Sequence, residues 1–146
     1  MQIKIATTQK DFADVFRIRT NVFIGEQQVP PHEEIDDLDG YVPILVAYTA
    51  ENQAVGTARI ILKEDNIAKI GRVAVDKNYR RAGVGKKLME ASINYVNTQT
   101  DATIIKLDAQ VTAIPFYLSL GFTPYGDEFL DAGIRHVAMK YVLNSK

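Results

Sequence analysis

Residues 72–87 read RVAVDKNYRRAGVGKK, and this stretch joins an apolar strand to a helix through Gly83 and Gly85. Its basic residues are Lys77, Arg80, Arg81, Lys86 and Lys87. Glycines remove side chains where a ligand approaches the backbone, and the free N–H groups at a helix start carry a partial positive charge. The stretch therefore predicts a strand, a glycine loop and a helix whose N-terminus suits an anion such as a pyrophosphate.

A Gly-x-Gly pair alone is a weak signal, because a strand-to-helix turn with a solvated basic rim has the same pattern. Two nucleotide motifs are excluded. A Walker A loop needs Ser or Thr where Lys87 stands and a glycine where Arg80 stands, and a Rossmann fingerprint needs its third glycine where Leu88 stands. A different phosphate-binding loop and a purely structural turn both remain open at this point.

Outward from this stretch, hydrophobic periodicity predicts a single domain, residues 1–146, of the α/β (α+β) class. We expect strands at residues 2–6, 41–49, 54–62, 67–75, 103–109, near 122 and at 134–143. We expect helices after a capping box of Thr8 and Asp11, at residues 83–96 and at residues 112–120. Residues 28–40, with two prolines and five acidic side chains, are expected to form a solvated loop. This order describes a mixed, twisted sheet with helices on both faces.

Composition excludes several classes of function. The chain has 146 residues, a formal net charge of −1 and no cysteine, so it has no global field for nucleic acid or an anionic membrane and no thiolate chemistry. No segment is long and apolar enough to span a bilayer, and a cytoplasmic location is the default for a cysteine-free domain. His32, Glu33, Glu34 and the distant His136 lack a metal-ligand spacing, so we expect no metal.

Three motifs in register resemble the GNAT superfamily of N-acetyltransferases. Residues 80–85, Arg-Arg-Ala-Gly-Val-Gly, match its Gln/Arg-x-x-Gly-x-Gly/Ala motif, and the strand at residues 72–75 precedes it at the expected place. The segment from Ala113 to Phe122, with Phe116, Tyr117 and Gly121, matches its Phe-Tyr-x-x-x-Gly-Phe pattern. Residues 22–27 and 130–136 also resemble a small bacterial subgroup, the YjcF-like proteins, so the resemblance covers nearly the whole chain.

The resemblance implies a GNAT fold and the use of acetyl-coenzyme A as acetyl donor, with direct attack by a primary amine in a ternary complex. It implies that loop N–H groups hold the pyrophosphate, that pantetheine follows the preceding strand, and that the central strands splay near Ala74 and Ala109. An N–H of that strand then serves as an oxyanion hole. The implied cofactor-binding residues are Val73, Ala74, Val75, Arg80, Arg81, Ala82, Gly83, Val84, Gly85, Lys86 and Phe116.

Tyr117 is the residue that the resemblance assigns to proton donation toward the departing thiolate. The alternative is a core residue, because Ala113, Phe116, Tyr117 and Leu120 share helical spacing and a buried tyrosine usually only finds a partner for its hydroxyl. Both interpretations stay open from the residues alone.

The sequence contains several candidates for binding the acceptor amine and for removing its proton, and it does not decide among them. An alkyl ammonium with a pKa of about 10.4 must lose a proton before it attacks. Glu26 could accept that proton and bind the amine, or only pair with Arg19; His136 could act as a base, or only as a strand residue. Arg19, placed in an apolar stripe, could hold an acceptor carboxylate or form a buried pair with Glu26.

The expected partner is a small-molecule or peptide amine, with no nucleic acid and no membrane, and a homodimer stays open because dimers are the commonest assembly. Two other functions remain open: transfer from a longer acyl-coenzyme A, and a coenzyme A binding or sensing module without turnover. A nucleic-acid binder is disfavoured, because the basic stretch lacks interleaved aromatic residues beyond Tyr79.

Overall fold

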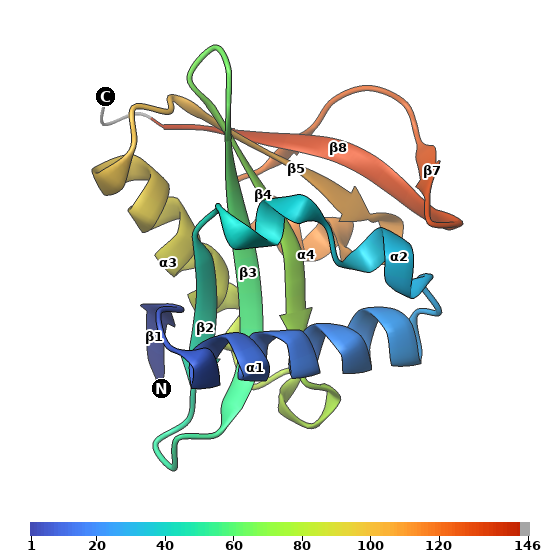
Figure 1. Cartoon of the computed structure of the whole chain (residues 1–146). Helices are drawn as coiled ribbons and strands as arrows, with labels where there is room; N and C mark the ends of the chain where they lie inside the picture. The colour runs from blue at the N-terminus through green and yellow to red at the C-terminus, as the bar shows by residue number, and fades with distance from the viewer. Residues whose placement is uncertain (144–146) are drawn as a thin grey trace. The chain divides into compact units, whose positions relative to one another are not determined.

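The computed structural model describes residues 1–143 (Figure 1). These residues cluster into two compact units. The first unit consists of Met1–Ile60 and Arg72–Ser92, and the second of Ile61–Gly71 and Ile93–Lys146, described up to Leu143. Three elements run through both units: β3 (Ala54–Lys63), β4 (Ile67–Val75) and α3 (Val84–Gln99). The single domain over residues 1–146 stays a prediction.

The first unit begins with a strand and a helix whose start is fixed by local chemistry. The Thr8 hydroxyl accepts from the Asp11 N–H at 3.0 Å while the Asp11 carboxylate accepts from the Thr8 N–H, which confirms the predicted capping box. The further elements of this unit are β1 (Gln2–Ile5), α1 (Gln9–Arg19), the π-helix η1 (Thr20–Glu26), α2 (Pro31–Glu34), the 3₁₀ helices η2 (Asp37–Gly40) and η3 (Lys77–Tyr79), and β2 (Ile44–Tyr48). Its strands follow the order β1-β2-β3-β4, with β2 antiparallel to both β1 and β3.

Helices cover both faces of the sheet in this unit. Val15 and Ile18 of α1 share one buried cluster with Val46 of β2, so α1 packs on the face to which Val46 points. Neighbouring strand residues point to opposite faces, and Ala47 pairs with Gly56 of β3. A Cβ added to Gly56 would meet side chains of α3, so α3 packs on the other face.

The second unit is organised around one long strand. Its own elements are β5 (Ile104–Gln110), the 3₁₀ helix η4 (Val111–Ala113), α4 (Ile114–Ser119), β6 (Thr123–Pro124), β7 (Phe129–Asp131) and β8 (Ile134–Val142). β5 lies parallel to β4 in the register Ile67–Ile104 and antiparallel to β8 along its whole length. The short strands β6 and β7 both pair antiparallel with β8.

The predicted fold class, a mixed sheet of the α/β type with helices, is confirmed, and the sheet formed by residues 1–143 has eight strands. Three local predictions differ. β7 is an additional strand, the first helix continues as a π-helix after Arg19, and residues 28–40 contain α2 and η2. α2 starts with Pro31 in its first turn, where the missing N–H costs no helical hydrogen bond. Within residues 1–143, no helix is long and apolar enough to cross a membrane.

Candidate functional site

The loop between β4 and α3 presents unbonded N–H groups at a helix start. The helical ladder opens with the Lys87 N–H, which donates to the Gly83 oxygen at 3.1 Å. The N–H groups of Val84, Gly85 and Lys86 lie ahead of that bond and have no carbonyl within the helix to reach. Gly83 has a φ of 81°, which a glycine adopts without strain, and a Cβ added there would meet no protein atom within 4 Å. The donor set and the open space beside Gly83 therefore fit a pyrophosphate.

Positive charge around this loop is left largely uncompensated. Among the described residues, no carboxylate forms an ion pair with Lys77, Arg81, Lys86 or Lys87, and all four side chains are exposed. Arg81 has a φ of 69°, so the loop contains two left-handed residues, Arg81 and Gly83. An anion at this helix start would meet backbone dipoles and free cations together.

Arg72 distorts β4 immediately before the residues expected to follow pantetheine. Its φ is 50°, an uncommon conformation for a non-glycine residue that costs of order 1–3 kcal/mol and concentrates at functional sites. The guanidinium holds the residue there by donating to the main-chain oxygens of Glu34, at 2.9 and 3.1 Å, and Glu33, at 3.2 Å. Sequence reasoning missed this role, although an arginine beside the apolar run Val73–Val75 was a signal.

Glu26 and Arg80 form a two-pronged ion pair. Glu26 ends the π-helix, and its carboxylate oxygens lie 2.8 and 3.0 Å from the terminal nitrogens of Arg80. The Arg80 Nε donates to the Val75 oxygen at 3.1 Å, which ties the loop to the end of β4. The structure thus brings the acceptor-side candidate Glu26 and the cofactor-side candidate Arg80 together, a pairing that the sequence did not predict.

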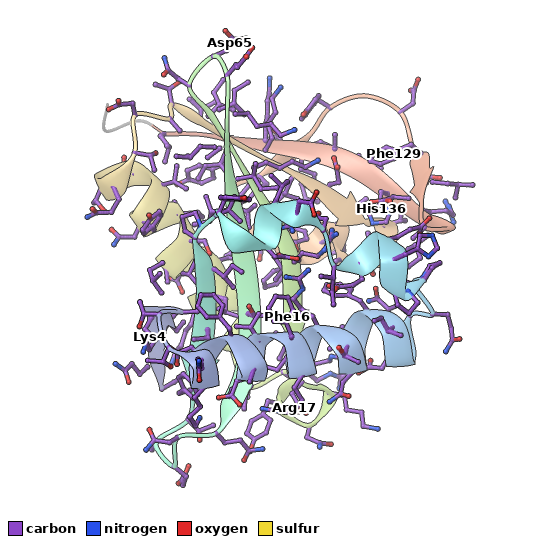
Figure 2. All side chains as sticks on the ribbon, in the orientation of Figure 1. Lys4, Phe16, Arg17, Asp65, Phe129 and His136 are labelled. Atoms are coloured by element: carbon purple, nitrogen blue, oxygen red, sulfur yellow. The ribbon has the colours of Figure 1, made fainter. Side chains whose placement is uncertain are left out.

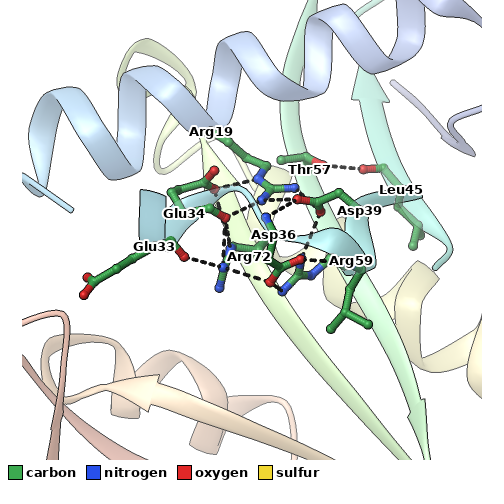
Figure 3. Close-up of polar contacts among 10 residues, drawn as sticks. Arg19, Glu33, Glu34, Asp36, Asp39, Leu45, Thr57, Arg59 and Arg72 are labelled. Carbon is green, nitrogen blue, oxygen red and sulfur yellow. Dashed lines mark hydrogen bonds and ion pairs between the residues drawn. The ribbon is translucent and has the colours of Figure 1, made fainter. Parts of the chain in front are cut away.

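Arg19 lies in a buried charge cluster, defined as Arg19, Arg59, Arg72, Glu34, Asp36 and Asp39 (Figure 3). Arg19 is 1% exposed and donates to Glu34 Oε1 at 2.6 Å and to Asp39 at 2.7 and 3.1 Å. The alternative that Arg19 pairs with Glu26 is therefore wrong, because Arg19 is taken by Glu34 and Asp39. Its predicted role toward an acceptor carboxylate stays a prediction.

The expected solvated loop is also wrong for part of its length. Glu34 is 2% exposed, and the Asp39 side chain is 6% exposed. Burial alone would raise the pKa of Asp39, but the hydrogen bonds and charges of Arg19 and Arg59 outweigh it and hold that pKa below its ordinary value. Burial likewise acts to lower the pKa of Arg19, and the two carboxylates outweigh it and raise that pKa.

In the second unit, Tyr117 lies in α4 among aromatic rings. Its ring meets Phe116 edge to face at a centroid distance of 5.0 Å and Phe122 at 6.0 Å. The residue is 9% exposed, and burial raises the pKa of its hydroxyl to about 12. Within the described part of the chain, that hydroxyl has no hydrogen-bond partner, so the packing alone does not explain why a tyrosine rather than a phenylalanine stands here.

His136 lies in β8 with one ring nitrogen already bonded. Its Nδ1 is 2.7 Å from the Ile134 oxygen, and because a carbonyl only accepts, Nδ1 carries the proton and Nε2 keeps a lone pair in the neutral ring. The ring stacks on Phe129 of β7 at 5.7 Å, and both side chains are labelled in Figure 2. This tautomer suits a general base, and the catalytic role of His136 stays a prediction.

The candidate residues thus fall into two groups. The glycine loop, Val73–Val75, Arg19 and Glu26 belong to the first unit, and Phe116, Tyr117 and His136 belong to the second. Within residues 1–143, no group of three or more metal-ligating side chains gathers.

Comparison with known proteins identifies the class. Residues 22–143 match the family model of the acetyltransferase (GNAT) domain. The chain is 39% identical over 140 residues to the "Uncharacterized N-acetyltransferase YjcF" of Bacillus subtilis, which covers 95% of this chain and 98% of that protein. The protein is therefore an acyltransferase. More specifically, the chain belongs to the GNAT acetyltransferase family.

Solved structures agree with this assignment. An acyl-CoA N-acyltransferase from Pseudomonas aeruginosa superposes with a TM-score of 0.84 and 26% identity, covering 96% of this chain and 99% of that one. A Bacillus subtilis acetyltransferase solved in complex with CoA has a TM-score of 0.72 and 16% identity, covering 97% of this chain and 98% of that one. The second likeness shows a shared fold.

Proposed function

We propose that this protein is a cytoplasmic N-acetyltransferase that moves the acetyl group of acetyl-coenzyme A to a primary amine by direct attack in a ternary complex. The main support for the proposal comes from the geometry at the start of α3. There the N–H groups of Val84, Gly85 and Lys86 have no helical partners, and the basic side chains around them are mostly free of carboxylates. Membership in the GNAT family and the CoA complex of a protein with the same fold support the same ligand.

Acetyl-coenzyme A supplies an activated acetyl thioester when it is bound. The loop N–H groups hold the pyrophosphate, and Arg81 and Lys86 add charge-assisted bonds. The left-handed Arg72 turns the chain just ahead of Val73–Val75. Such irregularities in a strand re-aim the residues that follow, and we propose that one N–H of Val73–Val75 stabilises the oxyanion.

Tyr117 is proposed to assist the leaving sulfur as a hydrogen-bond donor. Its hydroxyl, with a pKa raised to about 12, remains protonated throughout the physiological range. A thiol has a pKa of about 8.5, so complete transfer of the Tyr117 proton to the thiolate would run uphill by about 3.5 pKa units, roughly 5 kcal/mol. A hydrogen bond from the Tyr117 hydroxyl to the sulfur avoids that cost. We therefore propose a hydrogen bond in place of the complete proton transfer expected from the sequence.

Two groups are candidates for the acceptor's proton. Glu26 offers a carboxylate at the end of η1, and His136 offers the Nε2 lone pair. An alkyl ammonium with a pKa of about 10.4 has no lone pair, so it must pass its first proton to one of these groups, directly or through water, before the nitrogen attacks.

The test is a screen of thiol release from acetyl-coenzyme A against amines, amino acids, polyamines, aminosugars and peptides. Because the chain has no cysteine, a thiol reagent reports coenzyme A without background from the protein. We expect release that depends on one acceptor class and a matching acetylated product by mass spectrometry. Tight coenzyme A binding with no release from any donor would instead favour the binding module, and faster release from longer acyl donors would favour the wider acyltransferase.

A further inference from the structure

Arg80 differs from every other cation of the glycine loop. Lys77, Arg81, Lys86 and Lys87 have no carboxylate partner among the described residues, whereas Arg80 meets both oxygens of Glu26 at 2.8 and 3.0 Å. Its Nε is bonded to the Val75 oxygen as well. Arg80 lies only three residues before Gly83 in the sequence. In the free protein, however, its guanidinium is paired with the Glu26 carboxylate and is not free for a ligand.

The partner carboxylate is placed by an unusual element. Glu26 is the last residue of a seven-residue π-helix, which closes with a bond from the Gln27 N–H to the Val22 oxygen at 3.1 Å. π-Helical turns are rare and frequently occur at functional sites. The element sets the end of η1 against the loop that follows β4, and the pair is formed there.

The ion pair between Arg80 and Glu26 is exposed enough for another anion to replace Glu26. The side chains of Arg80 and Glu26 are 44% and 33% exposed, and ion pairs at such sites contribute little net stability. Charge-assisted pairs of arginine with phosphate use the same planar fork as pairs with carboxylate. A phosphate within reach of Arg80 would therefore compete with Glu26 for the same guanidinium.

We propose that Arg80 changes partner when coenzyme A binds, leaving Glu26 for a phosphate of the cofactor and so freeing the Glu26 carboxylate for the acceptor. This proposal rests on the proposed function of the glycine loop. Arg80 is then a positioning residue, and the carboxylate that it releases prefers a cationic acceptor, such as an alkyl ammonium, over a neutral amine. The acceptor is expected to bind after the cofactor.

The coupling is measured by calorimetric titration of coenzyme A into four proteins: wild type, Glu26→Gln, Arg80→Gln and the double variant. Glu26→Gln removes the competitor and should tighten coenzyme A binding about two- to fivefold, the equivalent of one exposed ion pair. Arg80→Gln should weaken binding, and adding Glu26→Gln to it should change nothing further. The double variant separates competition for Arg80 from a general effect of removing one negative charge, which would persist without Arg80.

Glu128→Gln is the matched control, because Glu128 and Arg135 form a similar two-pronged pair at 2.6 and 2.9 Å in the other unit. It should leave coenzyme A affinity unchanged. Thermal melts of all variants check that they fold. The coupling is overturned if Glu26→Gln binds coenzyme A no more tightly than wild type, or if it tightens binding equally in the Arg80→Gln background. Wild-type protein that does not bind coenzyme A at all would overturn the proposed function itself.

A crystal structure of the wild-type protein with coenzyme A gives the second readout. We expect the Arg80 guanidinium on a phosphate oxygen and separated from Glu26. An Arg80 that keeps both bonds to Glu26 beside a bound phosphate would overturn the exchange, even where affinities had changed.

Discussion

The substitution Tyr117→Phe separates a catalytic hydroxyl from a packed ring. The ring is held edge to face by Phe116 at 5.0 Å and by Phe122 at 6.0 Å, and phenylalanine keeps both contacts. The hydroxyl has no partner within the described residues, so its removal leaves no protein group unsatisfied. We therefore expect the melting temperature and coenzyme A affinity to change little.

The expected loss is kinetic. A hydrogen bond to a charged group contributes about 1.5–3 kcal/mol, which corresponds to a factor of roughly 10 to 150 in rate. Sulfur is a weak acceptor, so the loss should lie toward the lower end, at about tenfold. Because the pKa of Tyr117 is raised to about 12, the hydroxyl does not titrate near neutrality, and the ratio of wild-type to variant rates should stay constant between about pH 6 and 9.

The assay is single-turnover thiol release with the best acceptor from the panel. Single-turnover conditions exclude product release as the limiting step. Equal rates for wild type and Tyr117→Phe, where chemistry limits, would return Tyr117 to a purely structural role. A rate ratio that changes between about pH 6 and 9 would contradict a Tyr117 hydroxyl that stays protonated over this range.

Four further predictions concern cofactor binding and stability. Gly83→Val places a β-branched residue at a φ of 81°, and by obstructing the loop it should abolish measurable coenzyme A binding in calorimetry of the folded variant; wild-type affinity would refute the phosphate site. Gly56→Ala puts a Cβ 2.7 Å from a side chain of α3 and should lower the free energy of unfolding in urea by about 1–3 kcal/mol. Glu34→Gln breaks a buried pair and should cost about 3–5 kcal/mol by the same measurement, whereas a surface pair would cost under about 1 kcal/mol. The pKa values of Asp11 and Asp39 lie below their ordinary value, so both groups stabilise the fold above the unfolded pKa of about 3.9; melting temperatures should fall as the pH drops from about 5 to 3, and a flat profile would contradict the shifts.

Periodicity and capping predicted the framework of the fold because both depend on neighbours in the sequence. The capping box at Thr8 forms as expected, and α3 runs from Val84 to Gln99 where residues 83–96 were predicted. β7 escaped prediction because all three of its residues are exposed and show no alternation. The π-helix escaped because an apolar stripe does not distinguish one helical hydrogen-bond pattern from another.

Partner choice among charged side chains could not be read from the sequence. Arg19 pairs with residues 15 and 20 positions away, and only the fold decides which carboxylates reach it. The acidic run at residues 33–39 therefore suggested solvated charge while Glu34 and Asp39 are buried. The one signal present was Arg19 itself, a cation within an apolar stripe that needed compensation. In the glycine loop, by contrast, the sequence did predict the unbonded N–H groups at the start of α3. Glycines and a helix start are features of neighbouring residues, so they can be recognised without knowing the fold.

The distribution of charge explains how a chain with a net charge of −1 can suit an anionic ligand. In the buried charge cluster, three arginines meet three carboxylates, so their formal charges balance within the cluster, with only Arg72 and Asp36 partly exposed, at 26% and 36%. Lys77, Arg81, Lys86 and Lys87 have no such partners among the described residues, and their charge is left for a ligand. Arg80 is an intermediate case: it has a carboxylate partner, Glu26, but that partner is exposed enough to be displaced. The sign of the ligand is thus set by which charges the fold neutralises internally, and the net charge of the chain says little about it.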